Sequence, residues 1–297
     1  MADAGPPTEG SFVLAIIGLI GVAVSVIVGF IWEGGHLMVL MQPAEFLIIG
    51  GAAIGGLLAG TPVKYVKMII AQLAGIMKGS LGKKDYIDLL VMMYELFTVA
   101  RKEGLMGMEK HIEHPEESQI FQKHPSFLKN HHALYFLCDT MRLIISGAAV
   151  TVYDLEALMD NDLETHHKEV SQPSDTLATM ADTLPGLGIV AAVLGVVIAM
   201  GAIDGPPEEL GHKVAAALVG TFLGILLSYG FVGPLAKNLA TANTEAAAYY
   251  ECLKQSLIAF HKGFVGTIAV EFARRVIPGD IRPGFTELED ACRAQKG

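Results

Sequence analysis

Charged side chains are scarce in this sequence. They make up 18% of its 297 residues, against about 25% in an average soluble domain. Basic residues are the rarer kind, and the net charge is −10, whereas a nucleic-acid-binding domain carries a basic patch. The composition therefore excludes an ordinary cytosolic globule and argues against a nucleic-acid partner.

Patterns for disulfides, metal sites and nucleophilic catalysis are also missing. The three cysteines (Cys138, Cys252 and Cys292) lie far apart with no CxxC spacing, so neither a disulfide framework nor a zinc site is indicated. Two histidine pairs, 131–132 and 166–167, place adjacent residues on different helix faces, and we interpret them as surface histidines. No Ser/His/Asp or Cys/His arrangement is recognisable. The sequence predicts no enzyme, no metal site and no bound cofactor.

Four charge-free stretches, by contrast, are long enough to cross a bilayer, which takes about 20 residues. They are Ser11–Ile31, Phe46–Val63, Thr183–Ile203 and Val214–Ala236. The first lacks the basic n-region and small-residue cleavage site of a signal peptide, so we interpret it as a retained span. The sequence thus predicts a polytopic membrane protein with four transmembrane helices.

The distribution of Lys and Arg predicts the orientation of these spans. Of 21 such residues, 12 lie in 64–182 and 8 lie beyond residue 236, and Lys213 is the remaining one. Because basic loops stay in the cytoplasm, the long loop, the tail and both termini are expected inside. We therefore expect an N-terminal extension (1–10), a transmembrane hairpin (11–63), a cytoplasmic helical domain (64–182), a second hairpin (183–236) and a cytoplasmic tail (237–297).

Helical periodicity dominates the cytoplasmic part, and strand signals are scarce. Apolar residues recur at helical spacing over 86–100, 129–146 and 151–170, with Thr151 as an N-cap. The run Ser171–Asp175 contains Pro173 and predicts a turn before the third span. The fourth span is expected to continue to about His261, followed by short helices near 268–276 and from 286. The predicted fold class is all-α.

Small residues form a stripe on each of the last two spans. They are Gly188, Ala192, Gly195, Ala199 and Ala202 on the third, and Ala217, Thr221, Gly224 and Ser228 on the fourth. Such stripes close tight helix pairs or line a narrow path, and plain packing is the commoner case. Candidate channel-lining residues are Ala192, Gly195, Thr221, Gly224 and Ser228.

None of the four stretches contains an ionisable side chain, the kind of group that carries protons or binds ions in membranes. A cation-conducting protein of this sequence would need a carboxylate from another chain. Glu45 lies just before the second stretch. We interpret it as a cap that stabilises the N-terminus of that helix rather than as a group that collects ions.

The run Ala217–Leu226 followed by Pro234 resembles the signature of the MotA family of flagellar motor stator subunits. Further stretches similar to the family are Gln42–Glu45, Leu143–Gly147, Glu156–Asp160, Asp182–Pro185 and Ala269–Phe272. They cover nearly the whole chain in order. The resemblance implies a ring of copies of this chain in the bacterial inner membrane, around a MotB-like single-span partner that supplies an intramembrane aspartate. Ion flow would then move the cytoplasmic domain against the rotor protein FliG.

Individual roles follow from the resemblance only where its motifs match. Pro185 and Pro234 take the places of the family's coupling prolines, although each could also be simple helix punctuation. Arg101, Glu109 and Asp162 take the places of charges that face the rotor, where charge can steer a transient contact. Thr221 matches the hydroxyl near the partner's aspartate. Ala192 stands where sodium-driven relatives carry threonine, which favours H⁺ over Na⁺ as the transported ion.

Two alternatives stay open at this point. An ExbB/TolQ-like proton-channel subunit would energise an envelope process, but such chains typically have three spans. A non-conducting membrane scaffold would use the small-residue stripes for packing alone.

Overall fold

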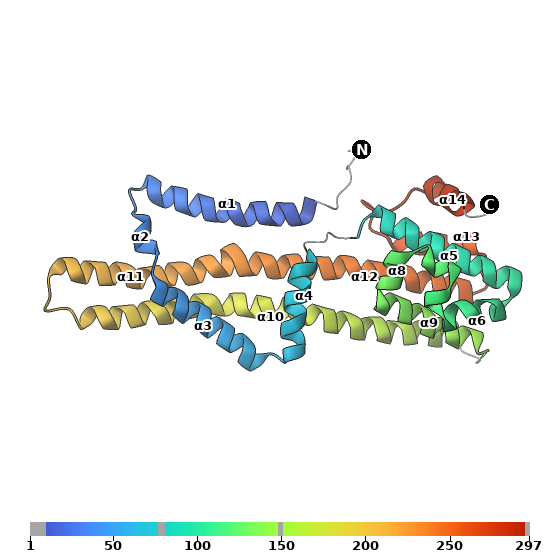
Figure 1. Ribbon diagram of the computed structural model, residues 1–297, viewed down its shortest axis with the longest axis horizontal. Coiled ribbons are helices and arrows are strands. Elements are labelled where there is room, and N and C mark those ends of the chain that lie inside the picture. Colours follow the sequence, from blue (N-terminus) through green and yellow to red (C-terminus); the bar gives the residue numbers. More distant parts are fainter. Residues whose placement is uncertain (1–9, 77–80, 148–150, 295–297) are drawn as a thin grey trace. The chain divides into compact units, whose positions relative to one another are not determined.

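The computed structural model describes residues 10–76, 81–147 and 151–294 (Figure 1), so the predicted extension 1–10 lies outside it except for Gly10. Every regular element in these ranges is helical, which confirms the all-α fold class. The elements are α1 (Gly10–Trp32), α2 (Leu37–Leu40), α3 (Pro43–Gly60), α4 (Val63–Ile76), α5 (Lys83–Glu103), α6 (Leu105–Glu113), η1 (Pro115–Glu117), α7 (Gln119–Gln122), α8 (Pro125–Lys129), α9 (His131–Ile145), α10 (Val152–Met200), α11 (Pro207–Ile225), η2 (Leu226–Val232), α12 (Gly233–His261), α13 (Gly266–Val276) and α14 (Phe285–Ala294).

Four helical segments are long and apolar enough to cross a membrane. They are Val13–Trp32, Leu37–Gly60, Val152–Met200 and Pro207–His261. These segments contain almost all of the four predicted charge-free stretches. The chain is therefore a multi-pass membrane protein by length and composition, as predicted.

The described residues divide into two compact units. Unit 1 comprises those within 80–169 and 243–297, and unit 2 those within 9–79 and 170–242. Helices α10 and α12 each contribute residues to both units.

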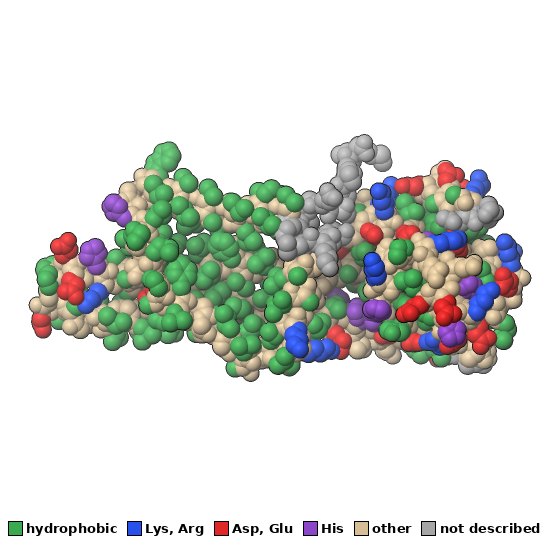
Figure 2. Space-filling model, in the orientation of Figure 1, with side chains coloured by type: hydrophobic (Ala, Val, Ile, Leu, Met, Phe, Trp, Pro, Cys, Tyr) green, Lys and Arg blue, Asp and Glu red, His purple; other side chains and the backbone are tan. Residues whose placement is uncertain are grey.

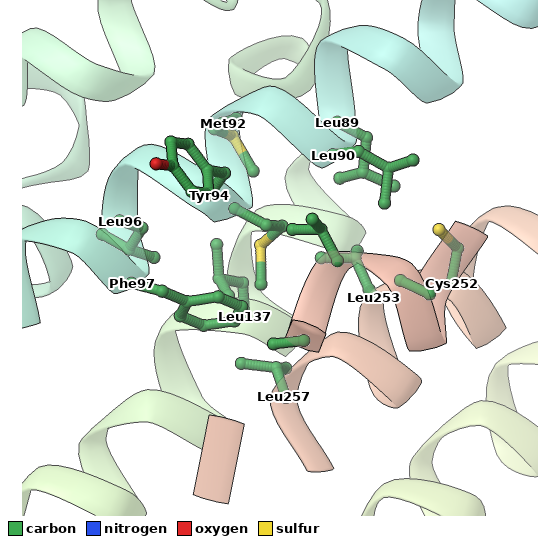
Figure 3. Close-up of a cluster of buried hydrophobic side chains, with 14 of the residues drawn as sticks. Leu89, Leu90, Met92, Tyr94, Leu96, Phe97, Leu137, Cys252, Leu253 and Leu257 are labelled. Carbon is green, nitrogen blue, oxygen red and sulfur yellow. The ribbon is translucent and has the colours of Figure 1, made fainter. Parts of the chain in front are cut away.

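Unit 1 has a conventional core of large apolar side chains contributed mainly by α5, α9, α12 and α13 (Figure 3). Helix α5 is capped at its N-terminus by Gly82, whose N–H donates to Asp85 Oδ2 at 2.7 Å. It ends at Gly104, where a φ of +75° favours glycine. Phe97 of α5 is fully buried and stacks on Phe260 of α12 with 4.4 Å between ring centroids. The amphipathic face predicted for 86–100 is thus the centre of this core.

Unit 2 is built differently, from long helices with smaller buried side chains. Helix α3 packs on α11 through a cluster that includes Ile49, Ala191 and Leu223. Helix α1 contacts η2, where a Cβ on Gly230 would lie 2.9 Å from Val22. Large apolar side chains cover the outside of these helices (Figure 2), as expected for helices that face lipid rather than water.

The predicted turn at 171–175 is wrong, because α10 runs through Pro173 without a break. Side-chain donors bind carbonyls around this proline: Gln72 Nε2 lies 2.9 Å from Val170 O, and Ser174 Oγ lies 2.8 Å from Ser171 O. Leu177, one turn later, is buried against the α4 and α12 residues of the same unit. Local packing and polar contacts therefore outweigh the helix-breaking tendency of one proline.

Candidate functional site

The centre of unit 2 is the crossing of α10 and α11, which lie side by side (Figure 1) with glycines at their points of closest approach. A Cβ on Gly188 would lie 2.8 Å from the carbonyl oxygen of Gly220 and 3.0 Å from Cα of Gly224. A Cβ on Gly224 would lie 2.6 Å from the carbonyl oxygen of Leu184. Backbone meets backbone here, so any larger side chain would force the helices apart.

The predicted channel-lining residues differ in how deeply they are buried at this crossing. Gly224 lies inside the helix–helix contact, and so does Gly195, whose Cβ would come 2.6 Å from Ala217 Cβ. Ala192, Thr221 and Gly195 are half-buried, whereas Gly224 and Ser228 are buried. A role on an ion path stays a prediction for all of them.

Ser228 is the most unusual of the predicted set. It lies in the π-helix η2, and its side chain is only 1% exposed. Its Oγ has no hydrogen-bond partner among the described residues. Short π-helical segments interrupt the regular hydrogen-bond ladder and are frequent at functional sites. At this point the fourth span therefore has an irregular backbone and a hydroxyl group without a hydrogen-bond partner among the described residues.

Neither predicted coupling proline marks a helix end. Pro185 lies well inside α10, and Pro234 is the second residue of α12, which follows η2 without a break. A proline inside a helix removes one backbone hydrogen bond and favours bending at that point. The interpretation of Pro185 as punctuation is therefore wrong, whereas Pro234 stands where the π-helix η2 gives way to α12.

The predicted place of Glu45 at the N-terminus of the second span's helix is confirmed by α3, but the sequence did not predict that this carboxyl group is buried inside unit 2. Helix α3 begins at Pro43 rather than at Phe46, so its first turn contains Glu45. The Glu45 side chain is 6% exposed, and its Oε2 has no hydrogen-bond partner in the described structure. A Cβ on Gly220 would lie 2.6 Å from this oxygen. Pro43 was the signal that could have placed the helix start correctly, because proline is favoured at the first helical position.

The three predicted rotor-facing charges lie in unit 1 on different helices. Arg101 is in the last turn of α5, Glu109 is in α6, and Asp162 is in the unit 1 part of α10. All three are exposed, and no hydrogen bond or ion pair found in the described residues joins any two of them. They are accessible on the surface of the unit, where Figure 2 shows charged side chains gathering.

The interpretation of the paired histidines as surface residues is wrong for His132 and His166, which are half-buried, while His131 and His167 are exposed. The His132 and His166 rings stack with 3.5 Å between centroids, and both meet Tyr250 edge-on. Burial, and after it the neighbouring His132, lower the pKa of His166 to about 4. No group of three or more potential metal ligands occurs in the part of the chain that the structure describes. The stacked pair is therefore neutral packing rather than solvated charge.

Known proteins similar to this chain match it along nearly its whole length. Residues 16–104 match the family described as Motility protein A N-terminal, and residues 129–251 match the MotA/TolQ/ExbB proton channel family. The chain is 43% identical over 282 residues to Motility protein A of Salmonella typhimurium, which covers 95% of each protein.

Two solved structures have the same fold. A C. jejuni MotAB structure matches with a TM-score of 0.72 and 21% identity, over 90% of this chain and 96% of that one. The flagellar MotAB stator complex from Bacillus subtilis matches with a TM-score of 0.67 and 24% identity, over 86% and 92%. The chain belongs to the motility protein A family, within the MotA/TolQ/ExbB proton channels.

Proposed function

We propose that this chain is the membrane subunit of a flagellar stator, which forms an ion channel together with a MotB-like single-span protein and converts ion flow into torque. The observation that carries the proposal is the match to motility protein A over 95% of the chain, across all four apolar helices. The fourth such helix counts against an ExbB/TolQ-like subunit, which typically has three spans.

The partner supplies the ion-carrying aspartate in this proposal. Copies of this chain surround it as a ring, and the long loop, the tail and both termini lie on the cytoplasmic side of the inner membrane. The biased distribution of Lys and Arg supports that orientation. Closed rings generated by one repeated interface are a common form of homo-oligomer.

Protons are the proposed ion. A dehydrated Na⁺ ion needs several oxygen ligands, whereas a proton needs only a carboxyl group and water. Ala192 offers no oxygen from its side chain, and Thr221 offers one hydroxyl. Swimming that persists without Na⁺ and stops with a protonophore would support this choice, and the reverse pattern would contradict it.

Torque would pass from the helices of unit 2 to the exposed charges of unit 1. Pro185 and Pro234 stand in α10 and α12, the helices through which the chain passes from one unit to the other. Bending at these prolines would displace Arg101, Glu109 and Asp162, which would contact FliG. Contacts between exposed charges are weak and are weakened further by salt. Weak contacts suit a surface that must bind and release its partner repeatedly.

Deletion of the gene in its own host tests the proposal. Cells should keep their filaments and fail to swim. The wild-type gene should restore swimming, while Pro185→Leu or a partner with its aspartate changed to asparagine should not. Normal swimming in a strain from which this gene and every other stator gene have been deleted would contradict the proposal.

A further inference from the structure

We propose that Glu45 is a proton-binding site on the outer half of the conduction path, additional to the carboxylate that the partner supplies. This inference rests on the proposed function and deepens it. It begins from Oε2 of Glu45, a carboxyl oxygen with no hydrogen-bond partner in the described residues, on a side chain that is more than nine-tenths buried.

The fold makes room for this carboxyl group by leaving out a side chain. Oε2 of Glu45 lies 2.6 Å from the point that a Cβ on Gly220 would occupy. The backbone nitrogen of Ala192 lies 3.1 Å from the same point. The carboxyl group is therefore at the level of Ala192 and Thr221, two half-buried residues that are predicted to lie on the ion path.

This level lies within the apolar part of the fourth span. Gly220 is six residues beyond the first residue of the charge-free stretch 214–236, or about 9 Å along the helix axis. The hydrocarbon core is about 30 Å thick. An ionisable group at such a depth is costly to keep, and groups of this kind mark ion pathways.

No charged side chain compensates Glu45 among the described residues. The charged and titratable groups of α11, the helix packed against it, lie in its first two turns: Glu208, Glu209, His212 and Lys213. Lys213 is paired with Glu209 at 2.8 Å. The part of α10 at the crossing, 184–200, carries none, and α2 carries none beyond its N-cap His36.

Two opposing effects let the group change its charge. Glu45 is the third residue of α3, where the helix dipole and free N–H groups favour a carboxylate. Its apolar surroundings favour the neutral acid. A proton arriving from outside would bind the carboxylate to form the neutral acid. It would leave when water or the partner's carboxylate accepts it, and no other bond changes.

The matched control is Glu33, an exposed acidic residue in the turn that follows α1. The experiment uses the full chain in complex with its MotB-like partner, reconstituted in vesicles, and measures proton uptake driven by a potassium diffusion potential. Glu45→Gln keeps the size of the side chain and removes its titration. We expect at least a fivefold lower proton flux for Glu45→Gln. Glu33→Gln should conduct like the wild type.

Glu45→Asp keeps the carboxyl group on a shorter side chain. It should retain flux within about twofold, with a shifted dependence on the external pH. Wild-type flux in Glu45→Gln would overturn the proposal and leave the proposed function intact. If Glu45→Gln does not assemble, an unchanged pH profile in Glu45→Asp would overturn it. A wild-type complex that passes no protons would overturn the proposed function, and the Glu45 site with it.

Discussion

Every regular element described in the two units of this chain is a helix, yet the units are held together in opposite ways. Unit 1 buries large side chains such as Tyr86, Phe97, Phe121 and Phe127 in one core, as water-exposed domains do. Unit 2 brings α10 and α11 together at glycines and leaves large apolar side chains on its outer surface.

The difference follows from the solvent that each unit meets. Water drives large apolar groups inward, so unit 1 gains stability from the area that it buries. Lipid gives no such advantage, so the helices of unit 2 gain stability from close backbone approach. The same secondary structure therefore depends on bulky residues in one unit and on the absence of side chains in the other.

Truncation of a bulky residue should harm unit 1 most. Phe97→Ala removes a buried ring that stacks on Phe260, and we expect a loss of about 3–5 kcal/mol in the free energy of unfolding of unit 1. Hydrogen exchange of unit 1 peptides would measure it. The control is Phe285→Ala, because that ring is 61% exposed and should cost little. Equal losses in the two variants would show that unit 1 does not depend on its core in this way.

A charge added to the outer surface should cost much more free energy in unit 2, which faces lipid, than in unit 1, which faces water. Ile20, 56% exposed in the middle of α1, and Met106, 71% exposed in α6, are similarly accessible. Ile20→Arg should cost about 3–4 kcal/mol of membrane insertion, the difference between Arg and Ile at a helix centre, and Met106→Arg should change stability by less than about 0.5 kcal/mol. Alkaline extraction of membranes would measure insertion. Normal insertion of Ile20→Arg would contradict the assignment of α1 to lipid.

Addition of a single methyl group should harm unit 2 where its helices touch. A Cβ at Gly224 would meet the backbone of Leu184, which cannot move aside as a side chain can. We expect Gly224→Ala to cost about 1–3 kcal/mol, measured by thermal unfolding of the purified protein. Gly186→Ala is the control, since nothing lies within 4 Å of its Cβ position. A stable Gly224→Ala variant would mean that α10 and α11 do not need this contact.

Features encoded by local patterns could be predicted from the sequence. The spans follow from charge-free length, and the continuation of the last span to His261 was confirmed by α12. The N-cap at Thr151 was also confirmed, because its Oγ1 accepts from Asp154 N–H at 3.2 Å. Each of these signals lies within a few residues of the feature that it determines.

Features that depend on contacts between distant segments could not be predicted in this way. Pro173 predicts a turn, and only the donor from Gln72 and the packing of Leu177 show why the helix continues. Glu45 lies one residue outside a charge-free stretch, and only Gly220, far along the chain, shows that it is buried. A buried ionisable group next to a membrane span is therefore missed when only the charge-free stretches are considered.

The effect that is smallest near neutral pH concerns protonation and distinguishes unit 1 by its stacked histidines. Because the pKa of His166 falls from 6.5 to about 4 on burial, the unfolded chain binds more protons than the folded chain between these values. The His166 contribution is thus complete above about pH 6.5 and is lost as the pH falls toward 4, by at most about 1.4 kcal/mol per pH unit. Hydrogen exchange of unit 1, corrected for intrinsic rates, should show this loss. His166→Gln should reduce it and exposed His167→Gln should not, whereas equal slopes in all three proteins would mean that the stacked pair already carries its protons in the folded state.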